Sequence, residues 1–174
     1  MAFIVASILT YVSLLHTSTL IGVLALAANT SWPLLRGRKC ILTVQALGSS
    51  LFGLHYLLIG AGTGAVMCAA AIVQSVTGAL VRRHTIRLGI VGMTLVAGVT
   101  MTFLTWQGLP SAFAQATGIF SAAGRLQRNV RRLRWLFVGS VLCSLIHNFL
   151  VGSLWGLGSD VVSAAILAVR IWRD

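Results

Sequence analysis

Long apolar stretches, interrupted by short bursts of positive charge, make up the whole of this chain. Hydrophobic residues account for 57% of its 174 residues and charged residues for 9%, and the mean hydropathy is +0.95. A soluble domain carries about 25% charged residues. The length alone would fit one soluble domain, but this composition indicates a protein that crosses a membrane several times.

The apolar stretches predict seven transmembrane helices. A helix needs roughly 20 apolar residues to cross a hydrocarbon core of about 30 Å. The first stretch lies within residues 2–35, with its core at 14–34, and the fifth is only weakly hydrophobic. We therefore predict an all-α polytopic membrane protein with spans near residues 14–34, 40–59, 65–81, 88–106, 112–123, 135–151 and 155–172.

The positions of the basic residues support this number of spans. All thirteen follow the first, third, fifth or seventh span, so seven crossings place them on one side of the membrane. Short loops rich in Lys and Arg stay in the cytoplasm. We therefore predict an outside N-terminus and a cytoplasmic C-terminus. The four groups are Arg36, Arg38 and Lys39; Arg82, Arg83 and Arg87; Arg125, Arg128, Arg131, Arg132 and Arg134; and Arg170 and Arg173.

An internal repeat divides the chain into two similar halves. The segment HYLLIGAGTG at residues 55–64 returns as HNFLVGSLWG at residues 147–156, an offset of 92 residues. We predict a three-helix repeat in residues 1–84, a linker helix in 85–107 and a second three-helix repeat in 108–174. An odd number of spans between the copies gives parallel repeats, related by an axis along the membrane normal. The matched pairs are His55 and His147, Leu58 and Leu150, Gly60 and Gly152, Gly64 and Gly156, and Arg36 and Arg128.

Composition also excludes several function classes. Asp160 and Asp174 are the only acids, so paired acid–base catalysts, divalent-metal cages and phosphoryl-transfer sites are nearly excluded. No nucleophile elbow, phosphate-binding loop or zinc-protease motif occurs. The basic groups lie between apolar runs, which argues against a nucleic-acid reader. We therefore expect no enzyme activity, no catalytic residue, no metal and no cofactor.

Polar residues inside a membrane are costly and often functional, so the few present are the candidate site residues. His55 and His147 precede equivalent turns and could bind a substrate hydroxyl, exchange a proton, or only anchor helices to one another. Asn148 and Gln74 are further candidates, and Gln74 could instead bond a neighbouring helix. Gln45 and Gln115 are the other amides within predicted spans.

Asp160 has two interpretations. A carboxylate near a helix N-terminus interacts favourably with the helix dipole, and we expect this simpler role at the membrane interface. Asp160 could alternatively pair with His147 across the turn and form a proton-responsive couple. The tryptophans near span ends, including Trp32, are expected to be interfacial anchors.

The chain resembles the YgjV family of bacterial inner-membrane proteins. The resemblance rests on His55, Leu57, Leu58 and Gly60 in the first half, and on the second-half residues His147, Asn148, Phe149, Gly152, Ser153, Gly156, Asp160, Arg170, Ile171, Trp172 and Arg173. It covers most of the chain from about residue 20.

That family is distantly similar to the SWEET and PQ-loop transporters, which have paired three-helix bundles joined by a linker helix. The similarity implies a solute pathway between the halves that opens alternately to each side. Two features depart from the transporters: no Pro-Gln pair occurs, and Gln74 and Ser163 stand where their third helices carry a pocket asparagine. Sugar as the substrate is therefore in question, and Ser163 joins the candidate site residues.

Two functions remain open from the sequence. The first is a transporter or facilitator for a small polar solute. The second is a non-transporting scaffold or accessory protein that binds lipid or another membrane protein, and a homo-oligomer would be compatible with either. The basic segment at residues 125–134 could contact anionic lipids, although control of topology explains it more simply.

Overall fold

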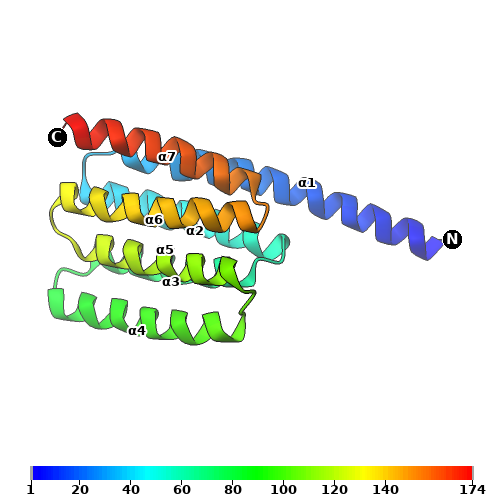
Figure 1. The fold of residues 1–174 in the computed structure, drawn as a ribbon, viewed down its shortest axis with the longest axis horizontal. Helices are drawn as coiled ribbons and strands as arrows, with labels where there is room; N and C mark the ends of the chain where they lie inside the picture. Colours follow the sequence, from blue (N-terminus) through cyan, green and yellow to red (C-terminus); the bar gives the residue numbers. More distant parts are fainter. Residues whose placement is uncertain (1, 174) are drawn as a thin grey trace.

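The structure is a computed structural model that describes the backbone of residues 2–173 and the side-chain environments of residues 16–173. Over these residues the chain is all-helical, with seven α-helices and one short 3-10 helix (Figure 1). Met1, on which the predicted outside N-terminus falls, lies outside the described residues. The elements are α1 (Ala2–Ser31), η1 (Trp32–Leu34), α2 (Arg38–Leu58), α3 (Gly62–Leu80), α4 (His84–Leu104), α5 (Leu109–Leu126), α6 (Val130–Leu150) and α7 (Leu154–Arg173).

Five of the helices are long and apolar enough to cross a membrane, within the part of the chain that was searched. These are α2, α3, α4, α6 and α7. α1 includes side chains that are not described. α5 is the stretch expected to be weakly hydrophobic, since glycines, polar residues and Arg125 interrupt its 18 residues. The all-helical fold is confirmed, and transmembrane crossing by α1 and α5 stays a prediction.

Six of the helices close into a ring. Each of α1, α2, α3, α5, α6 and α7 packs against the next one in that order, and α7 packs back against α1. α4 lies outside the ring, against α3 and α5, at the edge of the bundle (Figure 1). α4, the predicted linker helix, therefore covers the contact between α3 and α5, one of the two places at which the first three helices meet the last three.

The turns after α2 and α6 have the same geometry. Gly60 and Gly152 have φ angles of 77° and 69°, which L residues with a side chain rarely adopt. The preceding helices begin 92 residues apart, at Arg38 and Val130, and end 92 residues apart, at Leu58 and Leu150. A glycine in this conformation is a common helix terminator, which explains why the sequence located both turns correctly. We call this end of the bundle the glycine-turn end.

All thirteen basic residues lie toward the opposite end, which we call the basic end. It carries the loops α1–α2, α3–α4 and α5–α6 together with the end of α7 (Figure 1). The prediction of one charged end is confirmed, whereas the prediction that it is cytoplasmic stays a prediction. Several of these cations were expected in open loops but are buried inside helices, namely Arg87, Arg125 and Arg134. The reason is that α4, α5 and α6 extend beyond the apolar segments predicted as spans, so that each helix includes one of these cations.

Arg38 connects both halves at the basic end. Its Nε donates to Gln127 O at 2.9 Å, Nη1 to Gly78 O at 2.6 Å and Nη2 to Arg125 O at 2.7 Å. These carbonyls belong to the ends of α3 and α5, where backbone acceptors have no partner within the helix. A cation there also interacts favourably with the helix dipoles. Arg38 therefore connects α2 to α3 and α5, the two helices that α4 packs against.

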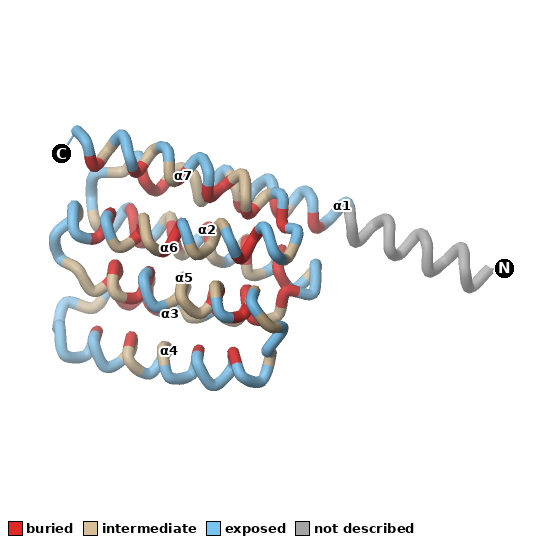
Figure 2. The backbone as a smooth tube through the Cα atoms, in the orientation of Figure 1, coloured by how far each residue is buried: buried red, intermediate tan, exposed pale blue. Residues whose placement is uncertain are grey.

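The bundle has many polar residues inside and apolar residues outside. Leu154 is 75% exposed and Phe103 is 74% exposed, whereas Ser75, Ser111 and Ser159 are fully buried. Figure 2 shows buried positions on the sides of helices that face the bundle and exposed positions on the outward sides. In a membrane the lipid tails cover the apolar exterior, and buried hydroxyls and amides bond across helices.

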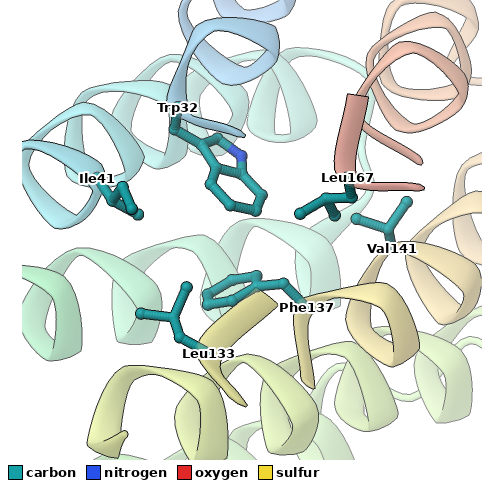
Figure 3. Packing of buried hydrophobic residues seen from close by; sticks show 6 residues of the cluster. All are labelled: Trp32, Ile41, Leu133, Phe137, Val141 and Leu167. Carbon is teal, nitrogen blue, oxygen red and sulfur yellow. The ribbon is translucent and has the colours of Figure 1, made fainter. Parts of the chain in front are cut away.

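An apolar cluster fills the bundle near the basic end. Trp32 and Phe137 lie with ring centroids 5.0 Å apart, and Ile41, Leu133, Val141 and Leu167 surround them (Figure 3). Trp32 is only 2% exposed, so its prediction as an interfacial anchor is wrong. Trp106, Trp135 and Trp172 are more than half exposed, as expected for anchors.

Candidate functional site

A cavity of about 130 Å³ lies at the centre of the six-helix ring. Every helix of the ring contributes to its wall, and α4 does not. The cavity can hold several water molecules, and its wall contains both apolar and polar groups, so it is suited to a small polar ligand. Representative lining residues, one from each helix, are Asn29, Tyr56, Cys68, Arg125, Asn148 and Asp160.

Toward the glycine-turn end, the wall contains a chain of three hydrogen-bonded side chains. Tyr56 donates through Oη to Asn148 Oδ1 at 2.6 Å, and Asn148 Nδ2 donates to Asp160 Oδ2 at 2.8 Å. All three residues are at most 6% exposed. Gly156 leaves room for this arrangement, because a Cβ there would overlap the Asn148 amide. The chain connects α2, α6 and α7 and puts a carboxyl group on the cavity wall.

The two predicted histidines occupy equivalent positions but differ at one nitrogen. His55 Nδ1 lies 3.1 Å from Ser18 O, and His147 Nδ1 lies 2.9 Å from Pro110 O. His55 Nε2 also has a partner, Ser153 Oγ at 3.2 Å. His147 Nε2 is buried and has no hydrogen-bond partner among the described residues.

The free nitrogen of His147 belongs to a residue that lines the cavity. A carbonyl oxygen can only accept, so Nδ1 of His147 carries the hydrogen in its bond to Pro110. In the neutral ring, Nε2 is then an acceptor. His147 therefore offers a hydrogen-bond acceptor that no described residue uses.

Toward the basic end, Arg125 lines the cavity. Its Nε donates to Ser75 Oγ at 2.8 Å, and its Nη1 donates to Gln74 Oε1 at 3.1 Å and Ser121 Oγ at 2.8 Å. The guanidinium carbon lies 5.5 Å from the centre of the Phe137 ring. Arg125 is 4% exposed, so this is a buried cation with neutral partners.

The structure brings together some predicted site residues and separates others. His147, Asn148 and Asp160 line the cavity. Gln74 does not line it: its Oε1 accepts from Arg125 Nη1, and its Nε2 donates to Thr94 Oγ1 at 2.9 Å. His55 and Ser163 are buried away from the cavity wall, and Ser163 Oγ has no partner among the described residues. Both uses of Gln74 are thus hydrogen bonds to neighbours.

The expected interfacial role of Asp160 is wrong. Asp160 is not in the first turn of α7, where the dipole would favour it, and it is 4% exposed inside the bundle. The helix begins at Leu154, so Asp160 is its seventh residue and lies in its second turn. Its hydrogen-bond partners are Asn148 and Ser144, and the described contacts do not include a bond to His147. The two side chains instead share one cavity.

Sequence reasoning missed Tyr56 and Arg125 and did not select Gln45. The signal for Tyr56 was available, since it lies 92 residues before Asn148. Arg125 was hidden in a group of basic residues that looked like a loop. The N-cap residue of α6, Asn129, was the clue that the loop is short, because its side chain accepts from the backbone of Arg131 and Arg132.

The helical fold, the apolar exterior and the polar interior define a multi-pass integral membrane protein. Comparison with protein families makes this more specific: residues 16–174 match the Imp-YgjV family, described as bacterial inner membrane protein. The chain belongs to this family and is therefore a bacterial inner-membrane protein. Among curated proteins and among solved structures, no significant match to the chain is found. The predicted relation to SWEET and PQ-loop transporters gains no support from these comparisons.

Proposed function

We propose that the protein transports, or facilitates the passage of, a small polar solute through the centre of the six-helix ring. The observation that supports this is the 130 Å³ cavity, whose wall is built by both halves of the chain and carries polar groups along its length. A protein that only packs against partners has no need for a void in its interior, because close packing is the rule. A scaffold role is therefore the weaker alternative.

The proposal includes the repeat arrangement expected from the sequence. Exchange of the first three helices with the last three would convert the α3–α5 contact into the α7–α1 contact, and both contacts exist. Equal offsets at both ends of α2 and α6 agree with this exchange. Two units of the kind found in SWEET-like proteins, residues 1–84 and 108–174, would then be joined by a linker in 85–107.

Parallel repeats suggest how access could alternate. If the two halves rock against each other, the cavity opens first toward one side and then toward the other. The polar groups at its two ends would meet the solute in turn. In this scheme the basic end faces the cytoplasm, in keeping with the distribution of Lys and Arg.

Flux through liposomes tests the proposal. The full-length protein is reconstituted, and the entry of uncharged and charged polar solutes of fewer than about ten heavy atoms is followed by osmotic light scattering and by radiolabel. Ala71 lines the cavity, so Ala71→Phe should reduce flux strongly. Ala97 is exposed on α4, outside the ring, and Ala97→Phe is the matched control that should leave flux unchanged.

Two results would refute the proposal. One is wild-type flux no higher than that of empty liposomes for every solute. The other, equal flux in wild type and Ala71→Phe, would refute the route through the ring, because a solute on that route must pass the cavity. Recovery of a stoichiometric membrane partner together with absent flux would establish the scaffold role instead.

A further inference from the structure

The basic end of the cavity holds a cation whose charge has no acidic partner among the described residues. Arg125 bonds to Ser75, Gln74 and Ser121, all of them neutral, and Phe137 covers one side of its guanidinium group. Its Nη2 is in none of the hydrogen bonds described for Arg125. An uncompensated buried charge costs several kcal/mol, so buried ions are normally paired. Arg125 therefore fits a site that receives its counter-charge from outside the chain.

A second unused donor lies at the same depth. Gln45 lines the cavity, is 3% exposed, and neither its Nε2 nor its Oε1 has a partner among the described residues. It is the seventh residue after the start of α2, and Phe137 is the seventh after the start of α6. Both helices start at the basic end, so Gln45 lies at the level of the Phe137 ring that contacts Arg125.

A purely structural role does not explain Arg125 as it explains the neighbouring arginines. Arg38, Arg134 and Arg170 all donate to backbone carbonyls at or beyond helix ends, where cations stabilise the helices. Arg125 instead uses side-chain oxygens and reaches the cavity wall. Its surroundings hold the guanidinium in place and leave Nη2 outside the described hydrogen bonds.

We propose that the cavity binds a small monocarboxylate whose carboxylate group is held by Arg125 and Gln45. The proposal rests on the transport function above and names its substrate class. A guanidinium matches the geometry of a carboxylate and forms strong charge-assisted hydrogen bonds with it. The amide of Gln45 would supply one more donor, and its oxygen could accept from a hydroxyl beside the carboxylate.

The polar groups of the cavity restrict the chemical class of the ligand further. Asn148, which holds Asp160, lies eleven residues beyond Phe137 on α6, or about 16 Å at a rise of about 1.5 Å per residue. The acceptors there are His147 Nε2, which no described residue uses, and the Asp160 carboxyl, which already accepts from Asn148 and Ser144.

A three-carbon solute held by Arg125 is too short to reach these acceptors at the same time, so they act on it only as it passes. At the Arg125 end, Arg125 is the one Lys or Arg among the described lining residues, so a second carboxylate would be buried without a counter-charge. Gln45 Oε1 there can accept from a hydroxyl group. We therefore expect hydroxylated monocarboxylates to bind and dicarboxylates to bind weakly.

Thermal unfolding of the purified full-length protein tests binding. Lactate and glycerate should raise the unfolding temperature by several degrees in a saturable way, whereas lactamide, glycerol and malate at the same ionic strength should have little effect. Arg125→Gln should abolish the shift produced by lactate, and Arg125→Lys should weaken it by roughly tenfold in concentration, since a lysine loses the planar fork. Arg128, exposed in the next loop, gives the matched control Arg128→Gln, which should respond like wild type.

Several outcomes would overturn the assignment. Equal stabilisation by chloride or phosphate would show a general salt effect, and an unchanged lactate response in Arg125→Gln would place the carboxylate elsewhere. Gel filtration establishes whether Arg125→Gln is folded, and if it is not, the weakened response of Arg125→Lys decides the question.

The same liposomes separate this inference from the proposed function. Flux of lactamide or glycerol through the wild-type protein, with no lactate binding, would refute the carboxylate site and leave transport standing. Saturable lactate binding that depends on Arg125, with no flux of any solute, would refute transport and leave the site standing. Lactate flux above that of empty liposomes, lost in Arg125→Gln and kept in Arg128→Gln, would support both.

Discussion

Tyr56 and Asn148 are separated by 92 residues, and they are hydrogen bonded to each other, with Tyr56 Oη 2.6 Å from Asn148 Oδ1. The offset is the one that relates the two similar halves of the sequence. Residues that a two-fold exchange would swap can touch only near its axis. The exchange of halves that we propose would put this bond near its axis, and both residues line the cavity at the centre of the ring.

Removal of this bond should destabilise the bundle modestly. Tyr56→Phe leaves Asn148 Oδ1 without its donor, and interhelical hydrogen bonds in membrane proteins contribute about 0.6 kcal/mol on average, up to about 1.7. We expect a loss of that size in the free energy of unfolding, measured by reversible unfolding in mixed micelles. Ser50→Ala, which removes an exposed hydroxyl from the same helix, should cost less. A loss equal to that of Ser50→Ala would contradict a structural contribution from the bond.

A methyl group at Gly156 should destabilise the protein more than one at Gly92. A Cβ at Gly156 would collide with the Asn148 amide, while one at Gly92 meets nothing within 4 Å. Overpacking costs about 1–3 kcal/mol, whereas alanine in an open helical position is tolerated or slightly favourable. Comparison of the unfolding temperatures of Gly156→Ala and Gly92→Ala checks this. Equal temperatures would mean that Asn148 can move away at no cost.

Arg38 should matter far more than its neighbour Lys39. Arg38 donates to three carbonyls on two helices, and Lys39 is exposed. Hydrogen bonds that involve a charged group contribute about 1.5–3 kcal/mol each. We therefore expect Arg38→Gln to lower the unfolding temperature markedly and Lys39→Gln to leave it nearly unchanged. Arg38→Lys should be intermediate, since it keeps the charge but not the three-way geometry; full rescue by lysine would show that charge alone is required.

Cysteine labelling from outside intact cells should distinguish the two ends of the bundle. In a background where Cys40, Cys68 and Cys143 are replaced by alanine, a cysteine at Gln107 should react with a membrane-impermeant maleimide. Cysteines at Arg83 and Arg128 should react only after the cells are opened, because loops rich in Lys and Arg remain in the cytoplasm. Labelling of Arg83→Cys and Arg128→Cys from opposite sides would remove the basis for a common charged end.

Most of the fold could be predicted from the lengths of the apolar stretches and from the glycines that end them. The second helix was expected at residues 40–59 and spans 38–58, and the glycine turns were located because their conformation requires glycine. Helix ends that contain charged residues were harder to predict. α5 was expected to end near residue 123 but continues to Leu126, because Arg125 finds side-chain partners on α3 that no local pattern reveals.

The site was only partly visible for the same reason. His147, Asn148 and Asp160 could be found as rare polar residues in apolar spans, and they do lie on one cavity. His55 satisfies the same criteria, yet Ser153 occupies its second nitrogen. Its counterpart His147 has alanine, Ala61, at the position equivalent to Ser153 and remains free. A single serine-to-alanine difference between the halves thus decides which histidine is available, and only spatial contacts show it.

α4 packs against the contact between α3 and α5 but not against the contact between α7 and α1. It spans the place where α3 meets α5, while α7 and α1 meet with no eighth helix behind them. If one half moves against the other, α4 restrains the contact between α3 and α5. We therefore expect the larger displacement at the contact between α1 and α7. That junction is closed by the packing of Gly22 against Trp155, where a Cβ on Gly22 would overlap the indole ring.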